Sequence, residues 1–139
     1  LAVMSQSFYL NPVGIVRKSD GKIWIDIYNE YMPALLGLEG FSHINVMYWF
    51  HRNDTAKKRK TLRVHPRGDQ NNPLTGVFAT HSPLRPNLIA LTLCKIIAIQ
   101  RSKIEIEDID ADEGSPVVDI KCYIPNSVSA SDVRLPDWV

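Results

Sequence analysis

The sequence lacks the features that mark several large protein classes. It contains no Gly-x-Gly-x-Gly loop and no alternation of strand and helix patterns, which excludes a Rossmann-type nucleotide-binding domain. Its longest apolar run, Ile96-Ile97-Ala98-Ile99, has the length of a strand and not the roughly 18 residues of a membrane helix, so no membrane partner is expected. Neither a repeat nor a low-complexity tract is present, and no secretory leader is recognisable.

Cysteine is also scarce. The two cysteines, Cys94 and Cys122, are far apart in the sequence and lie in apolar, strand-like runs. We therefore expect buried free thiols instead of a disulfide or a zinc site, which fits the reducing cytoplasm. The four histidines lack the close spacing of metal ligands, so no metal site is expected.

The formal net charge of +1 hides a strong separation of charge along the chain. Basic residues gather between His51 and Arg67, where Asp54 is the one acidic residue, whereas Ile104 to Asp119 contains many acidic residues and no lysine or arginine. A basic segment of this density can attract a phosphate backbone, although charge runs are usually solvated loops. The candidate RNA contacts are Lys57, Lys58, Arg59, Lys60, Arg63 and, from a later loop that it could instead brace, Arg85.

Most of the chain has the pattern of short β-strands. In Lys22–Tyr28 the isoleucines occupy one face and polar or aromatic residues occupy the other. One short helix is expected at Glu30–Leu38, with Pro33 early in it. The further expected strands are Ile44–Phe50, Val77–Thr80, Ile89–Ile99, Ile104–Glu107 and Val117–Tyr123.

Many short strands and little helix predict a mainly all-β protein, folded as an antiparallel closed or nearly closed β-barrel with one or two short helices. The length of 139 residues predicts a single domain over residues 1–139. Its core is expected at about residues 8–125, followed by a loosely held polar tail over residues 126–139. Met4 is a candidate natural start, with Leu1–Val3 preceding it.

The most informative stretch is residues 76–92, which read GVFATHSPLRPNLIALT. A polar loop stiffened by Pro83 and Pro86 carries His81, Ser82 and Arg85 between two apolar segments. Proline fixes φ, so a ligand held on such a loop costs less conformational freedom. The alternative is a rigid surface turn.

This stretch resembles the signature of the TsaA-like family, also called TrmO or UPF0066. Two further motifs of the family occur in the same order, and the opening residues 12–16 resemble its first strand. The resemblance covers approximately Phe8 to Pro125. The two further motifs are Leu38–Ile44 continuing through Tyr48–His51, and Glu113–Lys121 followed by Tyr123 and Pro125.

Members of this family are dimeric β-barrels that bind S-adenosylmethionine and methylate tRNA. They transfer the methyl group to N6 of threonylcarbamoyladenosine 37, next to the anticodon. The resemblance therefore implies S-adenosyl-L-methionine as the cofactor, the anticodon loop of tRNA as the substrate, and a homodimer. The cofactor contacts that it implies are Phe50, His51, His81, Ser82, Leu91, Asp112, Glu113, Gly114 and Ser115.

Each of these residues has an ordinary structural explanation as well. Phe50 and Leu91 could be plain core, His51 could be a surface histidine, and residues 112–115 form a good β-turn sequence without any ligand. Asp119 and Tyr123, expected on one face of a strand, are the candidate catalytic residues. A structural hydrogen bond is the alternative for Asp119.

Several positions depart from the family pattern. The Pro-Arg-Gln stretch of longer members is absent, His81 stands in place of an arginine, and Ala90 stands in place of a glycine. A histidine loses the permanent positive charge of an arginine. We therefore rank three hypotheses in this order: a tRNA methyltransferase, a barrel that binds S-adenosylmethionine or a related nucleoside without methyl transfer, and a plain RNA-binding barrel.

Overall fold

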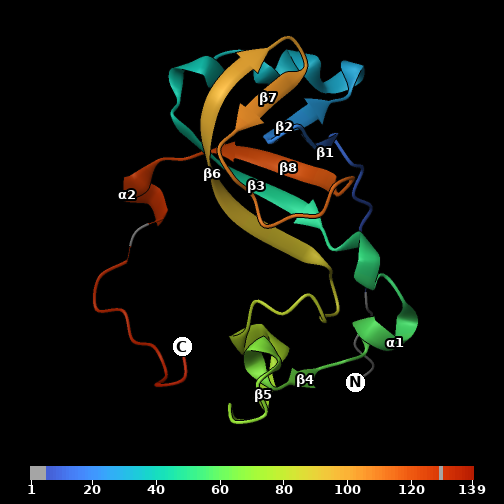
Figure 1. The fold of residues 1–139 in the computed structure, drawn as a ribbon, viewed down its shortest axis with the longest axis vertical. Helices are drawn as coiled ribbons and strands as arrows, with labels where there is room; N and C mark the ends of the chain where they lie inside the picture. Colours follow the sequence, from blue (N-terminus) through green and yellow to red (C-terminus); the bar gives the residue numbers. More distant parts are fainter. Residues whose placement is uncertain (1–5, 129) are drawn as a thin grey trace.

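Six strands form a closed antiparallel barrel in the spatial order β1-β2-β7-β6-β3-β8 (Figure 1). The computed structural model describes residues 6–128 and 130–139, so Leu1–Val3, Met4 and Ser129 lie outside the described residues. The all-β barrel predicted from the sequence is confirmed. The barrel strands are β1 (Gly14–Ser19), β2 (Lys22–Ile27), β3 (His43–Trp49), β6 (Ile89–Gln100), β7 (Lys103–Ile106) and β8 (Pro116–Cys122).

The barrel interior is filled by the residues that the alternating patterns direct inward. In β3, Ile44, Val46 and Tyr48 are buried while their neighbours are half-buried. Cys94 is buried among them, and burial raises the pKa of its thiol to about 11. Both cysteines are free, as predicted, although Cys122 is only half-buried.

The expected helix at Glu30–Leu38 is present as two short 3₁₀ helices, η1 (Asn29–Leu35) and η2 (Leu38–Gly40). Pro33 lies inside η1, where it cannot supply the amide that a longer α-helix would need. Figure 1 shows this segment at the end of the barrel opposite to the long excursion described next. In the described part of the chain, no helix is long and apolar enough to cross a membrane.

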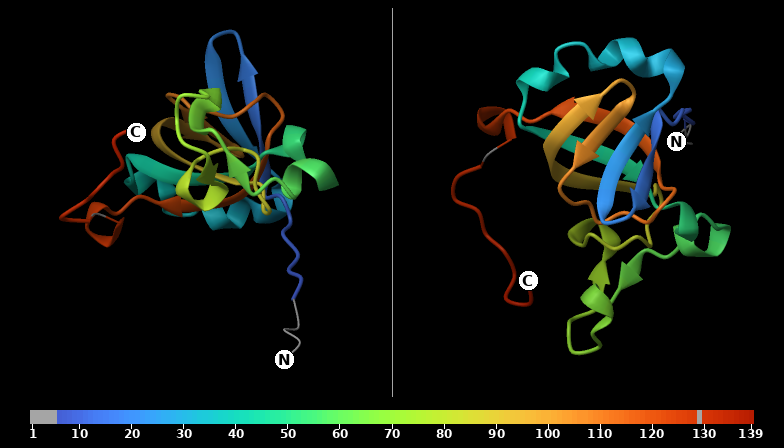
Figure 2. Two further views of the ribbon diagram at one scale, coloured as in Figure 1. Left: turned by 90° about the horizontal axis from the view of Figure 1, so that it is seen from below. Right: turned by 45° about the horizontal axis from the view of Figure 1, so that its top comes forward.

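Residues 51–88 leave the barrel between β3 and β6 and form an excursion that we call the arm (Figures 1 and 2). Its strands β4 (Arg63–Val64) and β5 (Thr75–Gly76) pair as a two-stranded ribbon. The short helices of the arm are η3 (His51–Asn53), α1 (Ala56–Arg59), η4 (Pro66–Gly68) and η5 (Val77–Ala79).

The predicted strand at Val77–Thr80 is wrong, because these residues form η5. The Thr80 amide donates to the Val77 carbonyl at 3.1 Å, and the Thr80 hydroxyl donates to the same oxygen at 2.8 Å. Two donors on one carbonyl close a tight turn directly after the extended ribbon, which ends at Gly76. After β8 comes helix α2 (Pro125–Val128), and the end of the chain lies beside the arm, where Leu135, Trp138 and Val139 line one cavity with arm residues (Figure 1).

Candidate functional site

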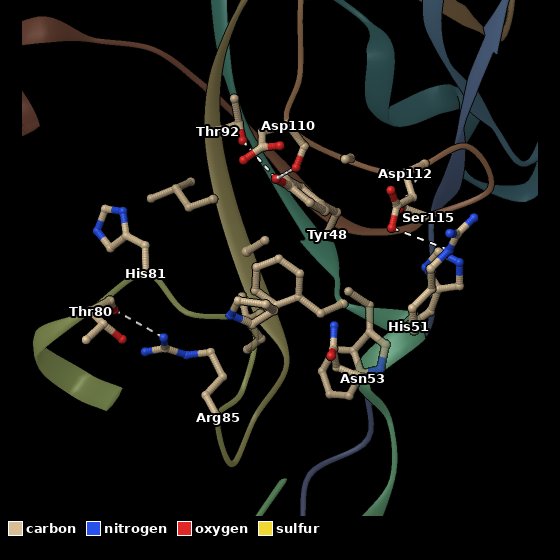
Figure 3. Close-up of a pocket in the computed structure, with 18 of the residues that line it drawn as sticks. Tyr48, His51, Asn53, Thr80, His81, Arg85, Thr92, Asp110, Asp112 and Ser115 are labelled. Carbon is tan, nitrogen blue, oxygen red and sulfur yellow. Dashed lines mark hydrogen bonds and ion pairs between the residues drawn. The ribbon is translucent and has the colours of Figure 1, made fainter. Parts of the chain in front are cut away.

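A cavity of about 550 Å³ lies where the arm leaves the barrel. Its walls come from the end of β3 with residues 48–53, the proline-rich loop of residues 80–85, the start of β6 at residues 89–92, and the connection between β7 and β8 at residues 110–115, together with Lys18 of β1. Figure 3 shows side chains from these segments around one space. Cavities of this size hold small organic ligands or nucleosides.

The proline-rich loop is braced by its own side chains. Arg85 Nη1 donates to the carbonyl oxygens of Thr80 at 3.2 Å and of Ser82 at 3.0 Å. The Ser82 hydroxyl accepts a hydrogen bond from the Leu84 amide at 3.1 Å, and Leu88 anchors the end of the loop in the core. Most polar groups of the loop are therefore used to fix its shape, while His81 stays exposed at the cavity.

Arg59 links α1 to the same loop and to the end of β3. Its Nε donates to the Pro86 carbonyl at 2.8 Å, and its guanidinium lies 5.5 Å from the centre of the Trp49 ring. Asp54 completes the group, because it accepts from Trp49 Nε1 at 3.1 Å and pairs with Arg59 Nη1 at 3.3 Å. These contacts hold the two walls of the cavity at a fixed separation.

The connection between β7 and β8, residues 107–115, closes this end of the barrel, and we call it the acidic connector. Ile109 and Ala111 are buried in the core, whereas Asp110 and Asp112 are exposed and line the cavity. The connector is held at its end by Ser115, which is 2% exposed and donates its hydroxyl to the Asp112 carbonyl at 2.7 Å. Its alternation therefore sends apolar side chains inward and carboxylates outward.

Tyr48 joins the acidic connector to the barrel. Its hydroxyl donates to the Asp110 carbonyl oxygen and shares a hydrogen bond of 3.1 Å with the Thr92 hydroxyl of β6. Burial raises the pKa of the Tyr48 phenol above its ordinary value; the Thr92 hydrogen bond opposes this shift, and the carboxylates of Asp110 and Asp112 add to it. Tyr48 consequently stays protonated and able to donate.

The cavity carries both signs of charge. Asp110 and Asp112 lie on one side of it, and His81 and Arg85 lie on the opposite side (Figure 3). Arg52 Nε pairs with Asp112 at 3.4 Å. A ligand that carries both a cationic and an anionic group could therefore find a partner for each. Among the described residues, no three His, Cys, Asp or Glu side chains gather in a way that could hold a metal ion.

Comparison with known proteins identifies the family. Residues 9–129 match the tRNA-methyltransferase O N-terminal domain. The chain belongs to this family.

Relatives of this tRNA-methyltransferase O family member differ in length and in name. A probable S-adenosyl-L-methionine-binding protein of Methanocaldococcus jannaschii is 48% identical over 116 residues, which cover 84% of this chain and 92% of the relative. A tRNA (adenine(37)-N6)-methyltransferase of Mus musculus is 40% identical over 114 residues, which cover 82% of this chain but 26% of the relative. The chain thus corresponds to nearly all of the archaeal protein and to about a quarter of the mouse enzyme.

A solved structure of the family has the same fold. The crystal structure of TrmO from Pseudomonas aeruginosa superposes with a TM-score of 0.71 at 23% identity, covering 93% of this chain and 61% of that chain. The likeness at this identity concerns the fold alone. This chain spans about three fifths of the solved one.

Most of the cofactor residues that the family resemblance implies meet at one place. Phe50, His51, His81, Leu91, Asp112 and Ser115 all line the cavity. Ser82 instead lines a neighbouring cavity of about 730 Å³ on the other side of the proline-rich loop. Glu113 and Gly114 are turned toward β1, where Glu113 accepts from the Lys18 amide at 2.6 Å and the Gly114 amide donates to Val16 at 2.8 Å.

The two candidate catalytic residues lie away from this cavity. Asp119 is exposed on β8, opposite Met47 of β3, and its carboxylate accepts from the Ile120 amide at 2.9 Å. Tyr123 is half-buried at the other end of β3, where its ring contacts that of His43 with 6.2 Å between centroids. The structure brings neither residue to the ligand space formed by the three family motifs.

The candidate RNA-binding residues fall into two groups. Lys57, Lys60 and Arg63 are exposed on the arm, and within the described residues they make no ion pair. Arg59 and Arg85 are half-buried and engaged in the contacts given above. Lys58 falls between the two groups: it is exposed, but its ammonium donates to the Arg52 carbonyl at 3.3 Å.

Tyr48, Thr92 and Asp110 are among the cavity residues that the sequence did not mark as candidates. Tyr48 lies on the same inward face of β3 as Ile44 and Val46. This alternation could have indicated that its hydroxyl points into the barrel. Asp110 alternates with two apolar residues, which could have indicated an extended segment with one buried face. Neither pattern reveals that the two segments meet.

Proposed function

We propose that this chain is an S-adenosyl-L-methionine-dependent methyltransferase that acts on N6 of an adenosine in tRNA. The observation that carries the proposal is the single cavity formed by all three family motifs. The relatives add to it, because those that match over most of their own length are named for binding S-adenosyl-L-methionine and the mammalian ones for methylating adenine 37 of tRNA.

The chemistry of the cavity suits this cofactor. The methionine part of S-adenosyl-L-methionine is a zwitterion with an additional sulfonium cation, and the cavity offers both carboxylates (Asp110, and Asp112 paired with Arg52) and, on the opposite side, His81 and Arg85. Transfer forms a bond between N6 and the methyl carbon while the methyl–sulfur bond breaks and its electron pair returns to sulfur. The N6 proton leaves to water or to a base. Much of the rate of such a step comes from in-line placement of the two reactants.

The acceptor that we propose is threonylcarbamoyladenosine 37 in the anticodon loop. The family resemblance supports this acceptor, and the exposed basic side chains of the arm support an RNA substrate. Lys57, Lys60 and Arg63 are exposed on the arm and make no ion pair with any residue that the structure describes, which leaves their charges available to a phosphate backbone. The two free cysteines fit the reducing cytoplasm as the site of the reaction.

A homodimer belongs to the same proposal. The outward side chains of β6 include Ile89, Leu91 and Leu93, which are 44–65% exposed and form a short apolar row; Ile97 follows beyond the exposed Lys95. Exposed apolar rows of this kind mark protein contacts. Since Leu91 and Ile89 also line the cavity, a second copy on β6 would lie beside the cofactor.

Two measurements test the enzymatic proposal. Calorimetry with S-adenosyl-L-methionine is expected to give one saturable site, and labelled cofactor is expected to transfer its methyl group to nucleoside 37 of tRNA that carries the threonylcarbamoyl group but lacks the methyl group. Binding without transfer would favour a cofactor-binding protein, the function named for the archaeal relatives. Absence of binding would contradict both functions.

The role of the arm is tested with the same tRNA. The triple replacement of Lys57, Lys60 and Arg63 by alanine removes three exposed charges without touching the cavity. We expect weaker tRNA binding and a slope of log affinity against log salt that is smaller by about two to three. Cofactor affinity should be unchanged, and an unaltered salt slope would show that the RNA binds elsewhere.

A further inference from the structure

Asp110 supplies the cavity with a carboxylate that is not paired with another described residue. In the part of the chain that the structure describes, its side chain makes no hydrogen bond and no ion pair. Asp112, by contrast, is paired with Arg52 at 3.4 Å, and Glu113 is bonded to Lys18 and Arg17 outside the cavity. Lys18 also reaches the cavity, but its ammonium donates to the Ile109 carbonyl at 3.2 Å.

The position of Asp110 is fixed although its side chain is exposed. The Tyr48 hydroxyl holds the Asp110 carbonyl, and the Thr92 hydroxyl holds Tyr48 at 3.1 Å. The flanking residues Ile109 and Ala111 are 2% and 7% exposed, so the backbone on both sides is embedded in the core. The backbone of Asp110 is therefore held at the cavity by a rigid segment.

The surroundings of Asp110 favour a cationic ligand group. Tyr48 and Phe50 lie edge to face with 6.0 Å between ring centroids, and both line the cavity with Asp110. Aromatic faces attract onium cations, and a carboxylate beside them adds a full negative charge. Of the basic side chains of the cavity, His81 and Arg85 lie on the opposite side (Figure 3), whereas Arg52 is paired with Asp112 and Lys18 donates to the Ile109 carbonyl.

We propose that Asp110 faces the sulfonium of the bound cofactor and gives the cavity its preference for S-adenosyl-L-methionine over the product S-adenosylhomocysteine. The inference rests on the proposed function. The two ligands share the adenosine and the amino acid groups and differ in the methyl group and the charge on sulfur. An unpaired carboxylate next to sulfur therefore favours the substrate form, and the same contact weakens once the methyl group has left, which promotes product release.

The test is the ratio of two dissociation constants. Isothermal titration of S-adenosyl-L-methionine and S-adenosylhomocysteine into the full chain gives the preference of the wild type. In Asp110→Asn, which keeps the size and the backbone, we expect the preference to fall by about tenfold, mainly through weaker binding of the charged cofactor. Glu107→Gln is the matched control, since it removes one exposed charge of the same connector outside the cavity and should leave the ratio unchanged.

A second variant tests the positioning of Asp110. Tyr48→Phe keeps the ring and removes the hydroxyl that holds the Asp110 carbonyl. We expect a partial loss of preference in this variant and no additional loss when it is combined with Asp110→Asn. A role of Tyr48 in stability alone would lower the melting temperature and leave the ratio intact, and this result would overturn its assigned role.

The outcomes separate this inference from the function on which it rests. If the wild type binds neither ligand, the proposed function fails and the inference fails with it. If the wild type binds both ligands but Asp110→Asn keeps the wild-type ratio, the cavity is the cofactor site and only the role of Asp110 is wrong. If Asp110→Asn loses the same affinity for both ligands, the carboxylate contacts the amino group that the two ligands share. This result would also overturn the inference.

Discussion

At the residue scale, Gly14 shows how closely the barrel strands approach one another. It begins β1 and is paired with Ile27 of β2 on one side and with Val117 of β8 on the other. A Cβ atom at this position would lie 2.6 Å from the Asp26 carbonyl oxygen and 3.2 Å from Ile27 Cδ1. The first of these neighbours is backbone and cannot move without disturbing the sheet.

We therefore expect Gly14→Ala to destabilise the protein by about 1–3 kcal/mol, the usual cost of inserting a methyl group where no space exists. The control is Gly40→Ala, because a Cβ at Gly40 meets no atom within 4 Å. Its effect should remain within roughly 0.5 kcal/mol. Urea denaturation followed by circular dichroism measures both changes, and equal midpoints for the two variants would contradict the contact.

Single residues also show where sequence reasoning ends. The sequence predicts a strand at Ile44–Phe50, and the structure has one at His43–Trp49 in which Ile44, Val46 and Tyr48 share the buried face. The partner of the Tyr48 hydroxyl is Asp110, which is 62 positions further along the chain. No local pattern encodes such a contact, because it depends on how the barrel closes. The same is true of Arg59, whose partner at Pro86 comes from another part of the arm.

At the element scale, the acidic connector is attached to β1 through Glu113. Its carboxylate accepts from the Lys18 amide at 2.6 Å and from Arg17 Nη1 at 3.2 Å. The Lys18 hydrogen bond, with a smaller contribution from Arg17, lowers the pKa of Glu113 below its ordinary value. The charged form is thus favoured by folding.

The consequence for stability follows from the direction of this shift. An acid whose pKa is lower in the folded state stabilises the fold above its unfolded pKa, about 4.3 for glutamate, and this stabilisation is lost as the pH falls through the folded pKa. Glu113→Gln should therefore be less stable than the wild type at pH 7, and the difference should shrink as the pH falls below about 4. Urea midpoints across this range measure it. A difference that stays constant with pH would show that the carboxylate charge is not involved.

Whole elements were predictable to different degrees. Long alternating strands such as β2 and β3 were found within one or two residues, because burial of one face imposes a period of two. The four-residue window Val77–Thr80 was too short to distinguish a strand from a turn, and the hydroxyl of Thr80 decided in favour of the 3₁₀ helix. The family motifs located the cavity, but they gave no geometry for Asp119 and Tyr123, which the barrel carries to other faces.

At the scale of the whole molecule, the outer surface of the barrel is uneven. Most outward positions are polar or charged, whereas β6 presents Leu91 and Leu93 with 65% and 48% of their surface exposed, together with Ile89, before the row ends at Lys95. Both Leu91 and Leu93 lie opposite outward residues of β3, Met47 and Asn45. A regular strand face of this kind is suited to packing against the same face of a second copy, since a two-fold axis lets one contact be made twice.

This arrangement predicts a homodimer that a single charge on β6 would dissociate. Leu93→Glu places a carboxylate in the apolar row without touching the cavity, and burying it against a second copy would require desolvation of the charge. We expect the dimer dissociation constant to rise by roughly 100-fold or more in sedimentation velocity, with an unchanged circular dichroism spectrum. Gln100→Glu is the control, because it adds the same charge at the exposed end of the same strand beyond the row. A wild type that stays monomeric at every concentration, or a Leu93→Glu variant as dimeric as the wild type, would exclude this face as the contact.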